Sequence, residues 1–316
     1  MTELPEINII IPLFNEEKVF ETLRERLVNL MNDSKRRISV IMIDDGSSDN
    51  TAMLMGELSL QDNRFNAVFL SRNFGHQLAL SAGFSVVNAT EAVFIIDGDL
   101  QDPPEFLEKF YAQIEDGYDV VYAVRQKRKE SIFKRAAYSL FYKIIKRISY
   151  VDIPLDSGDF SLVSRRVVDH INEMKEESRF IRGMRSWVGY KQIGIPYERQ
   201  ERHAGDSKYP FSKLLKLALN GIFNFSEFPI QFISRIGILT ILLSLSYFVY
   251  AIIKVMFTDE VPEGFVGIIF IITLFGGIQL LSIGVIGEYI LRIFFQVKGR
   301  PLFIIKKQIQ NGQTIL

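Results

Sequence analysis

Carboxylates are crowded into one short stretch of the chain. Residues 97–105 read DGDLQDPPE and directly follow EAVFII, whose last five residues are apolar. Asp97 and Asp99 stand two positions apart, and on an extended turn both carboxylates can face one point, where neither tolerates the other without a cation between them. Oxygen ligands favour Mg²⁺ or Mn²⁺ over zinc and leave positions for substrate phosphates. The spacing therefore predicts a divalent metal site that also binds a nucleotide diphosphate.

These acids also have a plainer interpretation as turn residues. Asp102 precedes Pro103 and Pro104, where a helix is expected to begin, and it suits a helix cap. The same interpretation suits Asp97 and Asp99 less well, because they lie before that helix start. We therefore expect a cap at Asp102 and metal binding at the other two.

Residues 1–210 alternate between apolar strands and helical segments. Strands are expected in INIII, ISVIMI, AVFLS, AVFII and YDVVYAV, and helices after Asn15 as a cap, after DDGSSDNT, through HQLALSAGFSVV and after DPPE. This order predicts an α/β fold, an open and largely parallel sheet covered by helices. Ligands bind outside the carboxyl ends of such strands, where PLFNEE, DDGSSD, SRNFGH and DGDLQD all fall. The polar clusters should therefore converge on one crevice.

Composition excludes several classes of protein. Lys and Arg together number 37, as do Asp and Glu, so a nucleic-acid binder that relies on a bulk positive field is not expected. The chain has no cysteine, which excludes disulfides, thiolate metal sites and a cysteine nucleophile, and fits a reducing compartment. The start MTELPEINIII lacks the basic region of a secretory signal. We expect a cytoplasmic catalytic part.

Two uncharged runs near the C-terminus are long enough to cross a bilayer. They span residues 236–253 and 265–287. The connector TDEVPEG has acids but no Lys or Arg, whereas Lys and Arg flank the runs on their outer sides, so the positive-inside rule places both termini in the cytoplasm. Two buried core helices are the alternative. The preceding stretch PFSKLLKLALNGIFNFSEFP suits either an interfacial helix or an ordinary amphipathic helix.

Several motifs together resemble the family 2 glycosyltransferases that load a sugar onto a polyprenyl phosphate. They are IPLFNEE, DDGSSDNT, SRNFGHQLALSAG, DGDLQDPPE, DSGDFSLVSRR, ERHAGDSKY and GVIGEYILRIFFQVKGRP. The resemblance covers nearly the whole chain and is greatest for the group of bactoprenol glucosyltransferases and dolichol-phosphate mannose synthases. It implies a GT-A domain at 1–210, interfacial helices at 211–231, two transmembrane helices at 232–295 and a cytoplasmic tail at 296–316, in the inner membrane.

The resemblance also implies site residues. The nucleotide would be bound by Pro12, Phe14, Glu16, Asp45 and Asp97, and the metal by Asp97, Asp99 and Gln101. A segment closing over the donor pyrophosphate would contain Arg202, Ser207 and Lys208, and the lipid phosphate would meet Arg125, Arg128 and Arg135. Arg125 follows a strand directly. For Arg128, a solvated helix start is an equal alternative.

The expected chemistry is a single displacement with inversion at the anomeric carbon. A phosphate monoester has a second pKa near 6, so the acceptor is already an anionic nucleophile and positioning and electrostatics should dominate. Asp156 and Asp159 in DSGDF are the candidates for a base or for orienting the acceptor, and one of them is expected to be a turn residue. The three histidines show no ligand spacing and are expected to be structural or solvated.

The partners expected are a nucleotide sugar, a polyprenyl phosphate and the membrane. UDP-glucose is favoured by the closing RP signature, an analogy with the family, and undecaprenyl phosphate is the expected acceptor; GDP-mannose or a UDP-aminosugar are the alternative donors. Glycines in the second apolar run make a homo-oligomer a hypothesis. RFIRGMRSWVGYK suits either the headgroup plane or a surface helix. A processive polysaccharide synthase is not favoured, because the Gln-x-x-Arg-Trp motif of such synthases is absent from the sequence. The alternative from another class is a nonenzymatic membrane scaffold or an accessory to lipid translocation.

Overall fold

The computed structural model describes residues 4–125, 154, 157–198, 228–258 and 264–316. Contacts divide the chain into two units. One comprises Met1–Lys146, Val151–Leu214 and Pro301–Leu316, and the other Arg147–Tyr150 and Leu215–Arg300. The described part of the first unit is a sheet covered by helices, and that of the second is two long helices.

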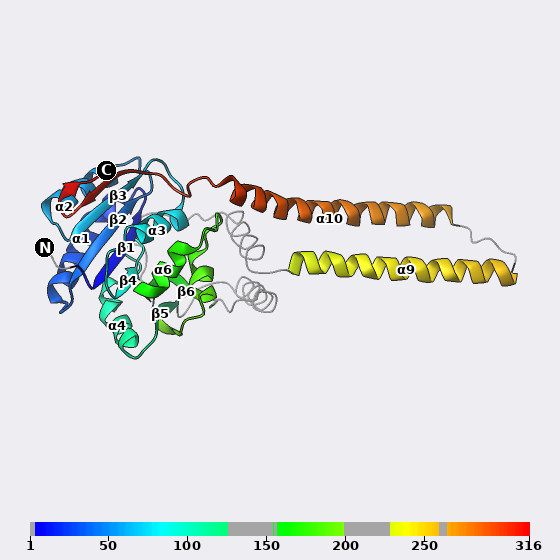
Figure 1. Ribbon diagram of the computed structural model, residues 1–316, viewed down its shortest axis with the longest axis horizontal. Coiled ribbons are helices and arrows are strands. Elements are labelled where there is room, and N and C mark those ends of the chain that lie inside the picture. Colours follow the sequence, from blue (N-terminus) through cyan, green and yellow to red (C-terminus); the bar gives the residue numbers. More distant parts are fainter. Residues whose placement is uncertain (1–3, 126–153, 155–156, 199–227, 259–263) are drawn as a thin grey trace. The chain divides into compact units, whose positions relative to one another are not determined.

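The sheet of the first unit has the strand order β7-β5-β6-β4-β1-β2-β3-β8-β9 (Figure 1). Its strands are β1 (Ile7–Leu13), β2 (Ile38–Asp44), β3 (Phe65–Leu70), β4 (Ala92–Ile95), β5 (Val120–Arg125), β6 (Ser157–Ser164), β7 (Gln192–Tyr197), β8 (Ile305–Gln310) and β9 (Gln313–Thr314). β1 to β4 pair in parallel, and only β6 and β8 of the described strands run the opposite way. The predicted mostly parallel sheet is confirmed.

Helices cover both faces of the sheet. They are α1 (Glu17–Asp33), α2 (Thr51–Gln61), α3 (His76–Ser85), the 3₁₀ turn η1 (Pro104–Phe106), α4 (Leu107–Glu115), α6 (Arg165–Glu173) and α7 (Ile181–Trp187). Side chains alternate across a strand, so Ile9 and Ile11 of β1 join one core with α1, α2 and α4, whereas Ile10 joins another with α3, α6 and α7. Because both faces are covered, β1 is buried throughout its length.

Two predicted helix caps are wrong. α1 begins after Glu16, and Asn15 instead adopts a left-handed backbone with φ of 58°. Asp102 is not the cap of the helical turn after it, because Pro103 holds that position without a side-chain cap hydrogen bond. The Asp102 carboxylate instead accepts a hydrogen bond of 2.9 Å from the Tyr197 hydroxyl at the end of β7. This bond ties the acidic loop to the sheet.

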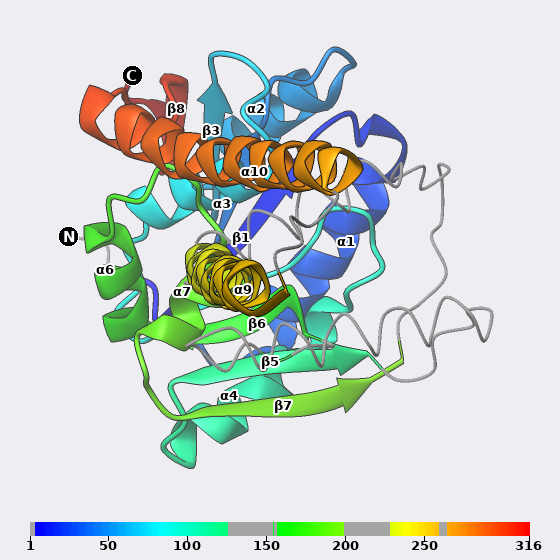
Figure 2. The ribbon, with the colours of Figure 1, turned by 90° about the vertical axis from the view of Figure 1, so that its right-hand side faces the viewer.

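The sequence patterns predicted β5 but missed β6, β7, β8 and β9. β6 inserts antiparallel between β4 and β5, and Figure 2 shows β5 and β7 side by side. β8 lies inside the stretch expected to be a tail, and it pairs antiparallel with β3. Ile309 of β8 is fully buried in the core with α1 and α2. Residues 305–314 are therefore part of the sheet.

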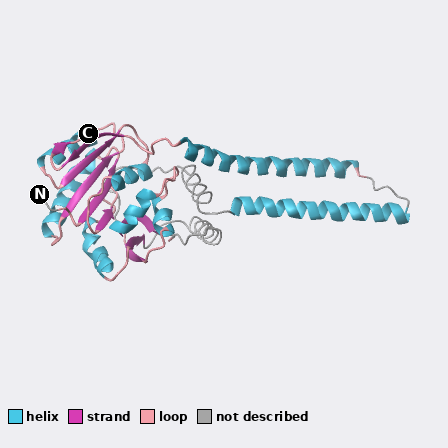
Figure 3. Ribbon diagram, viewed as in Figure 1, coloured by secondary structure: helices cyan, strands magenta, loops and turns pink. Residues whose placement is uncertain are grey.

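The second unit contains two long helices, α9 (Phe228–Thr258) and α10 (Phe265–Lys298), each continuous in Figure 3. They include both predicted apolar runs. By length and composition, Phe228–Tyr250 and Leu274–Lys298 can cross a membrane, and none of either candidate span is buried, which argues against core helices of a soluble domain.

The glycines of α10 were the reason to expect a homo-oligomer. At Gly276 and Gly284 an added Cβ would meet nothing within 4 Å. The homo-oligomer stays a prediction.

Candidate active site

The carboxyl ends of β1 and β2 are fastened together by their loops. The backbone N–H of Asn15 donates to the Ser47 hydroxyl at 3.0 Å, and the Asn15 side-chain oxygen accepts from the Ser48 N–H at 2.8 Å. The Glu16 N–H donates to the Thr51 hydroxyl at 2.9 Å. These bonds join the first and second polar clusters at one edge of the sheet, as predicted from the strand order.

The residues predicted to bind the nucleoside occupy this edge. Pro12 lies near the end of β1 and is buried, whereas Phe14 in the following loop is 46% exposed. Glu16 is partly buried just before α1. An exposed aromatic ring can stack on a base, and a carboxylate can accept hydrogen bonds from the N–H groups of that base. Their roles remain predictions.

Asp45 holds the loop that leads into α3. Its two carboxylate oxygens accept hydrogen bonds from the N–H groups of Phe74 at 2.7 Å and Gly75 at 2.9 Å. Burial raises the pKa of Asp45, although these two hydrogen bonds oppose that rise. Gly46 next to it has a φ of 73°, and a Cβ there would lie 2.6 Å from the backbone of Arg72 and Asn73. Because Phe74 and Gly75 directly precede His76, the hydrogen bonds from their N–H groups to Asp45 help to set the position of His76.

His76 lies between two of the predicted site acids. Its Nε2 is 3.6 Å from the Asp97 carboxylate and 3.3 Å from that of Asp159. Ile95 of β4 pairs with Ser161 of β6, and Asp97 and Asp159 each lie two residues from that pair toward the same edge of the sheet. Desolvation would lower the pKa of His76, but the hydrogen bond to Asp159 and the charges of both acids outweigh it and raise that pKa to about 9. His76 therefore belongs to the same cluster as the predicted site acids, and whether its role is structural stays a prediction.

Asp159 is held from several sides and is 6% exposed. Arg182 Nε donates to one carboxylate oxygen at 2.9 Å, and Arg182 Nη2 and Gln77 Nε2 donate to the other at 3.3 and 3.0 Å. Burial would raise the pKa of Asp159, but Arg182 and His76 hold it well below the usual value for an aspartate. Asp159 is therefore a carboxylate at neutral pH.

The predicted metal ligands lie on the turn after β4. Asp99 is 9% exposed and accepts a hydrogen bond of 3.2 Å from the Gln101 N–H. Leu100 between them has a left-handed φ of 61°, a conformation that residues other than glycine seldom adopt. No group of three or more His, Cys, Asp or Glu suited to a metal exists among the described residues. Two carboxylates still fit a Mg²⁺ or Mn²⁺ site, because such ions take one or two protein carboxylates and draw further oxygens from phosphates.

The remaining predicted residues are placed only in part. The backbone of Arg125 ends β5 opposite Tyr197, at the same edge of the sheet as the acidic turn. Six predicted residues lie outside the part of the chain that the structure describes: Arg128, Arg135, Asp156, Arg202, Ser207 and Lys208.

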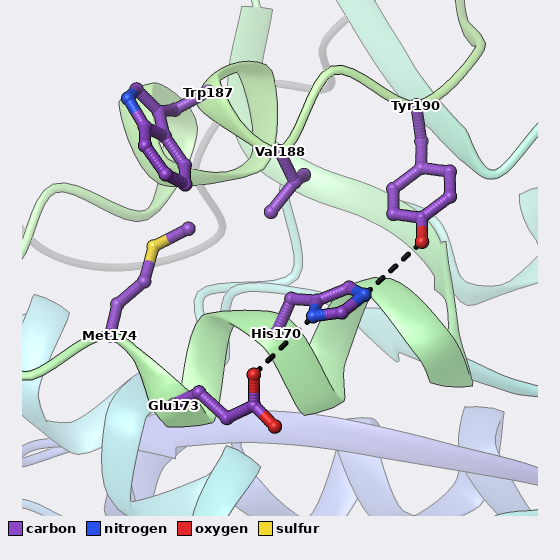
Figure 4. Close-up of a pocket in the computed structure, with 6 residues that line it drawn as sticks. All are labelled: His170, Glu173, Met174, Trp187, Val188 and Tyr190. Atoms are coloured by element: carbon purple, nitrogen blue, oxygen red, sulfur yellow. Dashed lines mark hydrogen bonds and ion pairs between the residues drawn. The ribbon is translucent and has the colours of Figure 1, made fainter.

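Two of the three arginines of RFIRGMRSWVGYK are buried and contribute to no exposed basic surface. Arg179 is 9% exposed and Arg185 is fully buried, which lowers the pKa of Arg185 to about 10. Trp187 is 55% exposed and borders a pocket of about 300 Å³ with Met174 and Tyr190 (Figure 4). His170 lines this pocket, where its ring stacks on Tyr190. Among the predicted site residues that the structure describes, none lines this pocket.

The sequence contains a known domain. Residues 8–171 match the domain described as glycosyl transferase family 2. This match includes the loops after β1, β2 and β4 and the Asp159 strand. The chain belongs to glycosyl transferase family 2, and it is a glycosyltransferase with a GT-A-like fold.

Relatives cover almost the full chain. An "uncharacterized glycosyltransferase YkcC" of Bacillus subtilis is 42% identical over 303 residues, which are 96% of this chain and 94% of the relative. The "SfII prophage-derived bactoprenol glucosyl transferase" of Shigella flexneri is 36% identical over 96% of this chain and 98% of its own length. The matched lengths include the C-terminal helices as well as the catalytic domain.

Proposed function

We propose that this chain transfers glucose from UDP-glucose to the phosphate of undecaprenyl phosphate, with inversion and with a divalent metal ion. One observation carries the proposal: Asp97 and Asp159 come together at the carboxyl edge of the sheet, with His76 between them. The apolar helices and the relative named as a bactoprenol glucosyl transferase support a lipid acceptor.

The donor would lie along the edge formed by the first, second and fourth strands. Phe14, Glu16 and Asp45 would hold the nucleoside, and Asp97, Asp99 and Gln101 would hold the metal at the diphosphate. When bound, Mg²⁺ or Mn²⁺ neutralises the charge of the leaving diphosphate. Arg202, Ser207 and Lys208 would close over the donor.

The acceptor phosphate would approach from the other side of the anomeric carbon. Arg125, Arg128 and Arg135 would offset its charge, because arginine pairs with phosphate through two parallel hydrogen bonds. Asp156 or Asp159 would orient the acceptor. At neutral pH the phosphate is largely deprotonated, so one of its oxygens can bond directly to the anomeric carbon. The bond between that carbon and the diphosphate oxygen breaks, and the nucleoside diphosphate leaves with the electron pair of that bond. GDP-mannose and UDP-aminosugars are the competing donors.

A transfer assay tests the proposal. Purified protein in detergent is incubated with Mg²⁺ or Mn²⁺, undecaprenyl phosphate and a panel of radiolabelled sugar nucleotides, and label is followed into the lipid phase. We expect label from UDP-glucose. A chelator or Asp99→Asn should lower the rate at least about 100-fold, because electrostatic stabilisation of a leaving group is worth that much. Asp33→Asn, at the exposed end of α1, is the matched control and should keep the wild-type rate.

Each outcome discriminates between the alternatives. Label from another donor alone would retain the reaction and replace UDP-glucose. Absence of label from every donor, with intact lipid, would reject a polyprenyl-phosphate acceptor. Rates unaffected by both chelator and Asp99→Asn would reject the metal role.

A further inference from the structure

Arg182 of α7 forms an ion pair with the predicted site residue Asp159. Its guanidinium lies side-on to Asp159, with Nε 2.9 Å from one oxygen and Nη2 3.3 Å from the other. The Asp159 side chain is 5% exposed, whereas that of Arg182 is 31% exposed. Such a fork fixes the plane of the carboxylate as well as its position.

Gln77 supports the same carboxylate from a different element. Its side-chain N–H donates to Asp159 at 3.0 Å, and its side-chain oxygen accepts from the Ile181 N–H at the start of α7 at 2.8 Å. Gln77 belongs to α3, Asp159 to β6 and Arg182 to α7. The three elements therefore meet at one carboxylate, and α7 begins where its second residue can reach it.

A second arginine of α7, Arg185, contacts β6, the strand that carries Asp159. Arg185 is fully buried and its Nη2 donates to the Gly158 carbonyl at 3.3 Å. Its guanidinium lies 5.2 Å from the centre of the Tyr122 ring. Arg182 and Arg185 are three residues apart and so lie on one side of the helix. α7 thereby fixes both the backbone and the side chain of the segment Gly158–Asp159.

We propose that Arg182 is a positioning residue for sugar transfer, acting through the orientation of the Asp159 carboxylate. This inference rests on the proposed function. It applies whether Asp159 orients the acceptor phosphate or accepts a proton, because either role requires a fixed carboxylate plane. Asp159 is within 3.3 Å of His76, which lies beside Asp97, so a rotated carboxylate would disturb the whole group.

Kinetics of single and double variants test the proposal in the full-length protein. Arg182→Gln should lower kcat for lipid glucosylation about 10- to 100-fold, the usual effect of removing a residue that orients a site group. The KM for the sugar nucleotide should change less than about twofold, since the nucleoside loops are held by other hydrogen bonds. Arg182→Lys keeps the charge but not the fork, so it should melt near the wild-type temperature with an intermediate kcat.

The double variant gives the sharper readout. If Arg182 acts through Asp159, Arg182→Gln should add less than about threefold to the loss caused by Asp159→Asn, because residues acting as one unit are not additive. Arg24→Gln removes an exposed ion pair with Glu21 on α1 and should leave kcat unchanged, alone or with Asp159→Asn.

Two results would overturn the inference. One is an Arg182→Gln enzyme with wild-type kcat per folded molecule and only a lower melting temperature, which is the mark of a purely structural ion pair. The other is a double variant whose loss equals the product of the single losses. An inactive wild-type enzyme would reject the proposed function instead, so the two failures are distinguishable.

Discussion

At the scale of single residues, the site depends on a close backbone approach at Gly46. This glycine follows Asp45, has a φ of 73°, and lies where a Cβ would be 2.6 Å from the backbone of residues 72 and 73. Alanine in a left-handed conformation costs about 1–2 kcal/mol, and forcing extra atoms into a packed region adds about 1–3 kcal/mol. Gly46→Ala should therefore destabilise the protein by about 2–5 kcal/mol.

Gly117→Ala is the matched control for this prediction. Gly117 has a φ of 84°, but a Cβ there meets nothing within 4 Å, so only the backbone cost of about 1–2 kcal/mol applies. Thermal melting of both variants in detergent measures the difference. Equal decreases in melting temperature would contradict the close approach of the β2 and β3 loops.

The sequence allowed some residues of the site to be predicted but not their contacts. Asp97 and Asp99 were recognisable because acids follow a strand directly, and Asp159 because DSGDF resembles a family motif. His76, Gln77 and Arg182 belong to segments distant along the chain from the acids, so no local spacing reveals that they meet. The strand order places SRNFGH, with His76, near the acidic turn, whereas the insertion of β6 beside β4 brings Asp159 to the same place.

At the scale of elements, β8 joins the end of the chain to the catalytic sheet. Ile309 pairs with Ala67 of β3 and is fully buried, whereas Ile304 just before the strand is 54% exposed. Ile309→Ala should destabilise the protein by about 2–5 kcal/mol, the usual cost of a large-to-small change in a core. Ile304→Ala should cost less than about 1 kcal/mol, because surface changes are small. Thermal melting checks both, and equal effects would contradict the buried strand.

The elements that sequence reasoning identified are those with strong periodic patterns. β1 and β2 are mostly apolar runs, and α1 repeats its buried residues at helical spacing, so each is evident without the fold. β8 reads IKKQIQ and carries two lysines on a strand near the edge of the sheet, which hides its single buried Ile309 among polar residues. Its place depends on pairing with β3, a tertiary contact.

At the scale of the whole molecule, the proposed reaction requires the catalytic domain and both termini on the cytoplasmic side. The connector between α9 and α10 has acids and no Lys or Arg, whereas positive charges lie beyond the outer ends of the apolar runs. Removing everything after Pro229 would test membrane dependence poorly, because it would delete β8 together with the helices. A topology measurement on the intact chain avoids this confusion.

The absence of cysteine makes such a measurement direct, because each introduced thiol is the only one in the protein. Glu260→Cys lies in the acidic connector, and Gln313→Cys lies in the exposed strand β9. In intact bacterial spheroplasts, a membrane-impermeant maleimide should label Glu260→Cys at once and Gln313→Cys only after the membrane is permeabilised. Labelling of Gln313→Cys in intact spheroplasts, with protection of Glu260→Cys, would reverse the topology and separate the enzyme from cytoplasmic sugar nucleotides. Equal labelling of both thiols before permeabilisation would contradict the hairpin.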